Sequence, residues 1–169
     1  MDLNQIKSLI RNVPNFPKAG IQFKDITTIL QNPIAFNYVV DSFFDYYKKM
    51  NPDVIVGIES RGFIFGAPLA IKLNCSFVLA RKPGKLPSNT ITQEYDLEYG
   101  TDALQLHSDS IKNNDNVVII DDLLATGGTA TACGELVKKL SGIEPNFGFF
   151  IDLGISEKSF VNCFSLVKF

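Results

Sequence analysis

Apolar residues recur along this chain in two alternating patterns. Leu3, Ile6, Ile10 and Val13 have helical spacing, and Pro14 is expected to end that helix. Asn32 followed by Pro33 is typical of a helix start, and six large apolar or aromatic residues after it would share one face: Phe36, Val39, Phe43, Tyr46, Tyr47 and Met50.

The rest of the chain alternates short apolar runs with longer amphipathic stretches. Strands are predicted at 53–58, 76–80, 116–124, 147–153 and 164–169. Helices are predicted at 61–73, where Pro68 should end or kink an early turn, and at 128–140, where Gly142 should cap the end. This alternation predicts an α/β fold: a doubly wound, mainly parallel sheet with flanking helices, whose ligands bind beyond the carboxyl ends of the strands.

Composition narrows the class of protein. The 169 residues are 46% hydrophobic and 20% charged, with a net charge of −2, which suits one domain with its own core. We therefore expect neither nucleic acid nor a membrane as a partner. The start of the chain lacks the pattern of a signal peptide, and the three cysteines have no disulfide or metal-site spacing, so a cytoplasmic protein is expected.

The segment VVIIDDLLATGGTA, residues 117–130, carries the functional argument. A buried strand runs into Asp121 and Asp122, and a glycine-containing turn then opens a helix. Glycines and a helix N-terminus present backbone N–H groups to an anion, so the turn would hold a phosphate. Carboxylates repel phosphate but accept hydrogen bonds from sugar hydroxyls, so the whole segment suits a ribose phosphate. The cradle comprises Ala125, Thr126, Gly127, Gly128 and Thr129.

Taken together, these residues resemble the type I phosphoribosyltransferases, and more narrowly their adenine-specific members. The resemblance covers about residues 12–169 and includes three further segments, GIESRGFIFGAPLA, ARKPGKLPSNTITQEYDLEYG and FPKAGIQFKDIT. It implies a single phosphoribosyltransferase domain over 1–169, in which residues 1–32 form a small hood over the base.

The resemblance also implies a reaction: transfer of the 5-phosphoribosyl group from phosphoribosyl pyrophosphate to adenine, giving AMP and pyrophosphate. Mg²⁺ would bind mainly through the substrate, with no dedicated protein metal site, and the protein would be a homodimer. The loop after the first predicted strand would bind pyrophosphate, and its peptide bond between Glu59 and Ser60 can be cis. A mobile surface loop over 80–100 would close on the site.

The resemblance assigns roles residue by residue. Glu98 would be the catalytic acid/base. Pyrophosphate would meet Glu59, Ser60, Arg61, Arg81 and Lys85. Adenine would meet Gln22 through its backbone, Phe23 by stacking, Lys24 and Leu123.

Two other functions stay open at this point. One is a phosphoribosyltransferase for another purine, which would share the fold and the phosphate cradle. The other is a non-catalytic regulator that senses phosphoribosyl pyrophosphate, although such a protein would need a basic face or an added segment to bind nucleic acid. The net negative charge argues against that second function.

Overall fold

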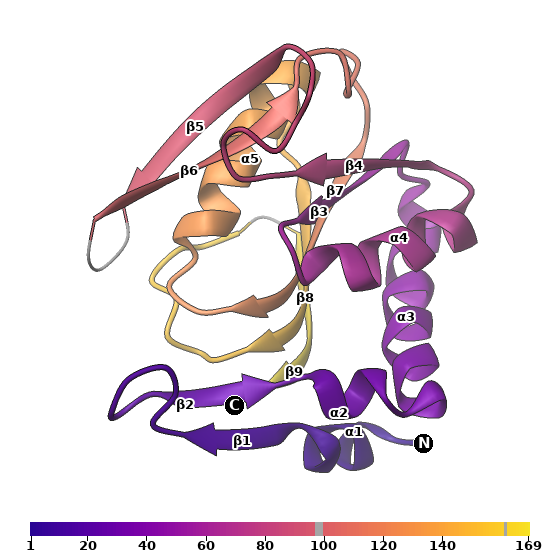
Figure 1. The fold of residues 1–169 in the computed structure, drawn as a ribbon. Coiled ribbons are helices and arrows are strands. Elements are labelled where there is room, and N and C mark those ends of the chain that lie inside the picture. Colours follow the sequence, from indigo (N-terminus) through magenta and orange to yellow (C-terminus); the bar gives the residue numbers. More distant parts are fainter. Residues whose placement is uncertain (97–99, 161) are drawn as a thin grey trace.

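A parallel sheet forms the centre of the computed structural model, which describes residues 1–96, 100–160 and 162–169 (Figure 1). In spatial order its strands are β4 (Ser76–Ala80), β3 (Val54–Ile58), β7 (Val117–Leu124), β8 (Asn146–Asp152) and β9 (Cys163–Lys168). All four neighbouring pairs are parallel, and every residue of β3 is buried. The chain order of the strands reverses between β3 and β7, which places the expected ligand crevice at their carboxyl ends.

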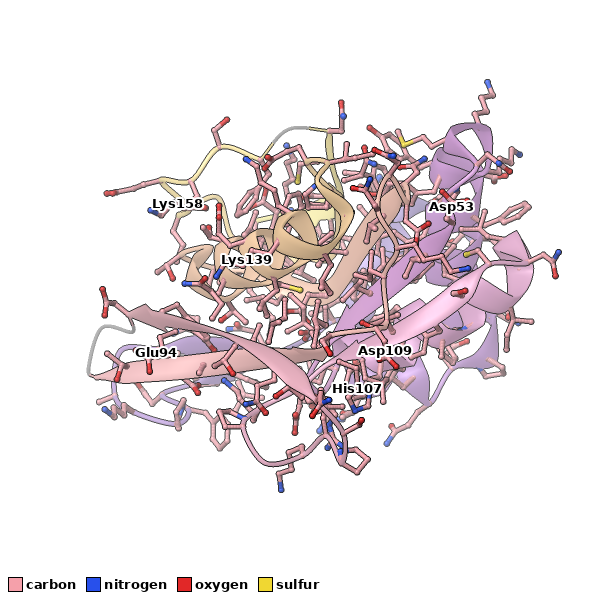
Figure 2. All side chains as sticks on the ribbon, turned by 90° about the horizontal axis from the view of Figure 1, so that it is seen from above. Asp53, Glu94, His107, Asp109, Lys139 and Lys158 are labelled. Atoms are coloured by element: carbon pink, nitrogen blue, oxygen red, sulfur yellow. The ribbon has the colours of Figure 1, made fainter. Side chains whose placement is uncertain are left out.

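Helices and a hairpin cover the two faces of this sheet, which confirms the predicted α/β class. On one face, α3 (Pro33–Tyr47) and α4 (Gly62–Leu73) share an apolar core with β3, β7 and β8. On the other, α5 (Gly128–Ser141) packs beside the antiparallel hairpin of β5 (Thr90–Asp96) and β6 (Thr101–His107). Figure 2 shows Lys139 of α5 lying toward this hairpin, where its ammonium bonds the amide oxygen of Gln93 at 2.8 Å.

The N-terminal cap of α3 and the C-terminal cap of α5 are formed by the residues that the sequence predicted. Asn32 accepts hydrogen bonds from the amides of Ile34 and Ala35, and a short 3-10 turn, η1 (Lys48–Met50), extends α3. Gly142 ends α5 in a left-handed conformation, and its amide bonds the carbonyl of Lys138. Both features confirm the cap predictions.

The first predicted helix is too long. Helix α1 (Leu3–Leu9) is followed by β1 (Arg11–Pro14), which pairs with β2 (Gln22–Asp25), and α2 (Thr27–Leu30) completes the N-terminal layer. The residue before a proline is pushed toward extended conformations, and Val13 precedes Pro14 and pairs with Phe23. An apolar residue that extended the helical spacing therefore belongs to a strand.

Two further predictions need correction. Helix α4 runs through Pro68, so the proline does not end the helix, while a kink there stays a prediction; buried Phe65 and Leu69 flank the proline on the core side. The segment 80–100 is not one surface loop, because residues 90–96 form β5, which pairs along its whole length with β6. Its exposed face carries Thr92, Glu94 and Asp96, and the polar Gln93 stands between Ile91 and Tyr95 on the half-buried face, so the sequence shows no clear apolar–polar alternation.

Within the described ranges, none of the helices combines the length and apolar character that a bilayer crossing needs.

Candidate active site at the reversal of strand order

A cavity of about 260 Å³ lies at the carboxyl ends of β3 and β7. It is lined from three directions: by residues 59–61 after β3, by residues 121–130 at the end of β7 and the start of α5, and by Lys82 with Tyr95. A larger recess of about 830 Å³ opens near the other ends of β3 and β4, but Asp53 is the one charged side chain among its described lining residues. We favour the smaller cavity because charged and hydrogen-bonding groups converge there.

The glycine turn opens α5 toward this cavity. Gly127 has a left-handed φ of 85°, which favours glycine, and it stands at the N-cap of α5 without a side-chain cap. A Cβ on Gly127 would lie 2.8 Å from the hydroxyl of Ser156, so the turn is also tightly packed from outside. The first amides of α5 have no partner within the helix and are available to an anion.

Two carboxylates stand where β7 reaches the same cavity. Asp121 accepts a hydrogen bond from the amide of Asp122 at 2.8 Å, and Asp122 is 3% exposed. Burial, and then the neighbouring Asp122 charge, raises the pKa of Asp121 well above its usual value. Burial also raises the pKa of Asp122, although the Arg61 guanidinium acts in the opposite direction.

Asp122 keeps one oxygen available. Its Oδ2 lies 3.1 Å from Nη1 of Arg61, yet it is buried and accepts no hydrogen bond from the described residues. A buried acceptor without a donor is costly, so this oxygen is suited to a ligand hydroxyl or to a water of a hydrated cation.

The loop after β3 is fixed by Glu59. The peptide bond between Glu59 and Ser60 is cis, as the resemblance implied. The Glu59 carboxylate accepts from the amide of Lys82 at 2.7 Å and from Nε of Arg81 at 3.3 Å. Burial opposes ionisation of Glu59, but these two donors outweigh it and hold its pKa below the usual value. Glu59 thus ties the loop to the basic segment, and Ser60 and Arg61 line the cavity beside it.

The sequence did not predict a polar cluster that forms the third side of the cavity, where Lys82 and Tyr95 line it. The Lys82 ammonium donates to the Tyr95 hydroxyl at 2.7 Å and also to the Asp102 carboxylate. Burial works against the charge of Lys82, but these partners raise its pKa, and the Lys82 hydrogen bond lowers that of Asp102. In the sequence Lys82 stands next to Arg81 at the basic start of the segment 80–100, whereas the pairing of Tyr95 with Asp102 becomes visible only once β5 and β6 are known to be strands.

The other predicted pyrophosphate residues stand outside the cavity lining. Arg81 and Lys85 do not line the cavity, and Nη1 of Arg81 bonds the carbonyl of Lys85 at 3.4 Å. Both therefore sit on one turn that reaches the cavity through Glu59 and Lys82. The predicted acid/base, Glu98, lies outside the described residues.

The side chains of the residues predicted to bind adenine point in two different directions. Phe23 lies under the Arg61 guanidinium, with 5.4 Å from the guanidinium carbon to the ring centroid, and its ring contacts Phe16 edge-on. The Lys24 ammonium lies instead 3.8 Å from the centre of the Phe169 ring. The Gln22 side chain accepts from Asn12 at 2.7 Å, while Leu123 lines the cavity itself.

Comparison with known proteins gives one consistent result. The model of the phosphoribosyl transferase domain matches residues 25–144. Adenine phosphoribosyltransferase from Acaryochloris marina is 55% identical over 148 residues, which are 88% of this chain and 87% of that protein. These matches contain both the loop after β3 and the glycine turn.

Solved structures agree over the whole length. The crystal structure of adenine phosphoribosyltransferase from Thermoanaerobacter pseudethanolicus has a TM-score of 0.94 and 46% identity, covering 99% of this chain and all of that one. The enzyme from Saccharomyces cerevisiae, complexed with an imino-altritol bisphosphate and adenine, has a TM-score of 0.90 and 37% identity, with 97% of each chain covered. The chain belongs to the phosphoribosyltransferase family, with the type I fold, and within that family to the adenine phosphoribosyltransferases.

Proposed function

We propose that this protein transfers the 5-phosphoribosyl group of phosphoribosyl pyrophosphate to adenine and releases AMP and pyrophosphate. The observation that carries the proposal is the meeting of an acidic pair and a glycine-opened helix N-terminus in one cavity at the strand-order reversal. The 50–55% identity to adenine phosphoribosyltransferases supports adenine as the base.

One end of the cavity binds the phosphate of the ribose phosphate, and the other end binds its sugar hydroxyls. Ala125, Thr126, Gly127, Gly128 and Thr129 hold the 5′-phosphate through backbone amides and threonine hydroxyls. Asp121 and Asp122 accept hydrogen bonds from the ribose hydroxyls, for which Oδ2 of Asp122 is available because it is ion-paired with Arg61 but accepts no hydrogen bond from the described residues. Fixing the sugar at both ends orients its anomeric carbon toward the base, which is the main contribution expected from positioning.

The basic residues of the site bind the pyrophosphate leaving group. The C–O bond to pyrophosphate breaks as the adenine nitrogen bonds the anomeric carbon, so positive charge develops on the sugar and negative charge on the diphosphate. Arg61, Arg81, Lys82 and Lys85 offset the negative charge, and the amides of the loop at Ser60 contribute further donors. Glu59 carries the same charge as pyrophosphate, so it acts by holding Arg81 and the Lys82 amide.

Magnesium would enter this site with the substrate. The described residues contain no group of three or more His, Cys, Asp and Glu side chains that could hold a metal, whereas the Asp121–Asp122 pair suits the waters of a hydrated cation. When bound, Mg²⁺ would neutralise diphosphate charge and make it a better leaving group.

The adenine base binds on the side of the N-terminal hairpin. Phe23 stacks on the purine, backbone groups near Gln22 read its edge and Leu123 supplies an apolar floor, whereas the Lys24 ammonium lies on the Phe169 ring, away from the base. Glu98 takes up the proton that adenine loses on forming the bond. Glu98→Gln is expected to lower kcat by about 100-fold or more while leaving the KM for phosphoribosyl pyrophosphate within about twofold. An unchanged kcat would remove this role from Glu98.

A homodimer in the cytoplasm is also part of the proposal, on the strength of the family resemblance. Sedimentation velocity at micromolar concentration tests the dimer directly. A single species with the mass of one 18.7 kDa chain would contradict it.

The activity itself is tested by pyrophosphate release. Purified protein, phosphoribosyl pyrophosphate and Mg²⁺ are combined with adenine, guanine or hypoxanthine in parallel. Release with adenine alone is expected. Preferred release with another purine would assign the enzyme to that base, and tight binding of phosphoribosyl pyrophosphate without any release would favour the regulator.

A further inference from the structure

The hairpin that carries the proposed base-reading residues is held to the main sheet by a cluster of two cations on one aromatic ring. The Phe169 ring has the Lys24 ammonium 3.8 Å from its centre and the Lys7 ammonium 4.5 Å from it. Lys7 comes from α1 and Lys24 from β2, so two elements of the N-terminal layer meet on a residue directly after β9. Figure 1 shows this end of the chain beside β2.

The ring is itself fixed. The Phe169 amide donates to the carbonyl of Asp152 at 3.0 Å, which continues the pairing of β9 with β8. Lys7 also donates to the carbonyl of Lys168. The contact therefore joins the hairpin to the rigid sheet and not to another surface loop.

Strand alternation connects this contact to the cavity. Successive side chains of a strand point to opposite faces, so Phe23 and Lys24 of β2 leave the strand in opposite directions. Phe23 reaches Arg61 at the cavity, and Lys24 reaches Phe169 on the other face. Two ring–cation contacts on consecutive residues thus hold β2 from both sides.

The hairpin needs such support because it is a small sheet. β1 and β2 pair over four residue pairs and form a separate two-stranded sheet. Such a sheet is at best marginally stable alone. The apolar anchors of this layer, Ile6, Ile10, Ile26 and Ile29, lie in α1, α2 and the adjoining residues, so they leave β2 itself dependent on side-chain contacts.

We propose that Phe169, with Lys7 and Lys24 on its ring, is a positioning residue for the purine: it holds β2 at the distance from the cavity at which Phe23 can stack on the base. This inference rests on the proposed function. Loosening the cluster lowers the fraction of molecules with a competent hood, and the apparent affinity for adenine falls by that same fraction. The phosphate cradle and the acidic pair, on β7 and α5, are unaffected.

Phe169→Leu tests this by removing the aromatic face while keeping an apolar side chain. The KM for adenine is expected to rise about three- to tenfold, with the KM for phosphoribosyl pyrophosphate and the melting temperature nearly unchanged. Phe169→Tyr is the matched control, because it keeps the ring and should restore the adenine KM. Lys7→Met, at a residue outside the cavity lining, should give a smaller rise in the same direction.

Hydrogen exchange provides a readout that does not depend on turnover. Backbone amides of residues 22–25 should exchange faster in Phe169→Leu than in wild type or Phe169→Tyr, while those of β7 stay unchanged. Equal rises in both KM values, no rise in the adenine KM, or no rescue by Phe169→Tyr would overturn the inference. A wild-type protein that consumes no adenine would instead overturn the proposed function, and unchanged exchange at residues 22–25 would still reject the positioning role.

Discussion

The junction of β7 with α5 and the two hairpins β1–β2 and β5–β6 contribute to one site, yet they are built differently. The junction is a single stretch of chain that leaves a buried strand and enters a helix with a core-facing side. The hairpins are two-stranded sheets outside the main sheet, attached by contacts such as Phe23 with Arg61 and Lys82 with Asp102. In the proposed function, phosphate binding would thus rest on a unit that is local in the chain, and base and diphosphate recognition would rest on longer-range contacts.

This difference predicts how each region responds to mutation. A change in the junction should abolish binding of the shared ribose phosphate, because backbone geometry has no substitute there. A change in a hairpin contact should alter one KM by a modest factor, because the contact supports a segment that other contacts also hold.

The largest effect is expected for Gly127→Ala. A Cβ there would be 2.8 Å from the Ser156 hydroxyl, and the left-handed φ of 85° adds about 1 kcal/mol of strain. Displacing the turn should weaken phosphoribosyl pyrophosphate binding by about 100-fold. Isothermal titration calorimetry measures this directly.

Gly142→Ala is the control for backbone strain. Gly142 also has a left-handed φ, 74°, and caps the other end of α5, away from the cavity. It should lose comparable stability and keep its affinity. If both variants bound equally well, the cradle would not depend on Gly127.

An intermediate effect is expected for Asp121→Asn, with opposite signs for activity and stability. The amide oxygen can still accept from the Asp122 amide, but the charge at this half-buried position is removed. The kcat/KM for phosphoribosyl pyrophosphate should fall about 10- to 100-fold through loss of a charged hydrogen bond to ribose. The ligand-free variant should melt a few degrees higher at pH 7.5.

The pH dependence follows from the raised pKa of Asp121. Its folded-state pKa exceeds its unfolded value, so this carboxyl destabilises the fold as pH rises through the interval between them. The melting-temperature gain of Asp121→Asn over wild type should therefore shrink as pH falls toward about 4, the unfolded pKa. A gain that stayed constant with pH in differential scanning calorimetry would contradict burial as the cause of the shift.

The smallest effects are expected for the contact between Lys82 and the β5–β6 hairpin. Lys82→Met removes a cation that lines the cavity and should raise the KM for phosphoribosyl pyrophosphate about fivefold. Asp102→Asn frees the same ammonium from its carboxylate and should lower that KM by about twofold. Initial-rate kinetics at fixed adenine measure both KM values. If both variants raise the KM, Asp102 acts only by holding the Lys82 ammonium in position.

The sequence was sufficient for the parts of the molecule that are local in the chain. The apolar runs at β3 and β7, the Asn32 cap and the acidic pair before the glycine turn each depend on neighbours a few residues away. The resemblance added Arg61, whose contacts with Phe23 and Asp122 join distant segments.

The misses have a common physical cause. Val13 fits a helical spacing but pairs across a hairpin with Phe23, and β5 carries a polar residue on its half-buried face, which hides its alternation. Tyr95, Asp102 and Phe169 gain their roles from partners more than ten residues away or on another strand. Such pairings depend on tertiary packing, which propensity and periodicity do not encode.

In the proposed function, the junction of β7 and α5 holds one sugar phosphate at both of its ends. A crystal structure of the protein with AMP tests it most directly. We expect the AMP phosphate within hydrogen-bond distance of the amides of residues 126–129, with the ribose hydroxyls on Asp121 and Asp122. AMP bound elsewhere, with this cavity empty, would contradict it.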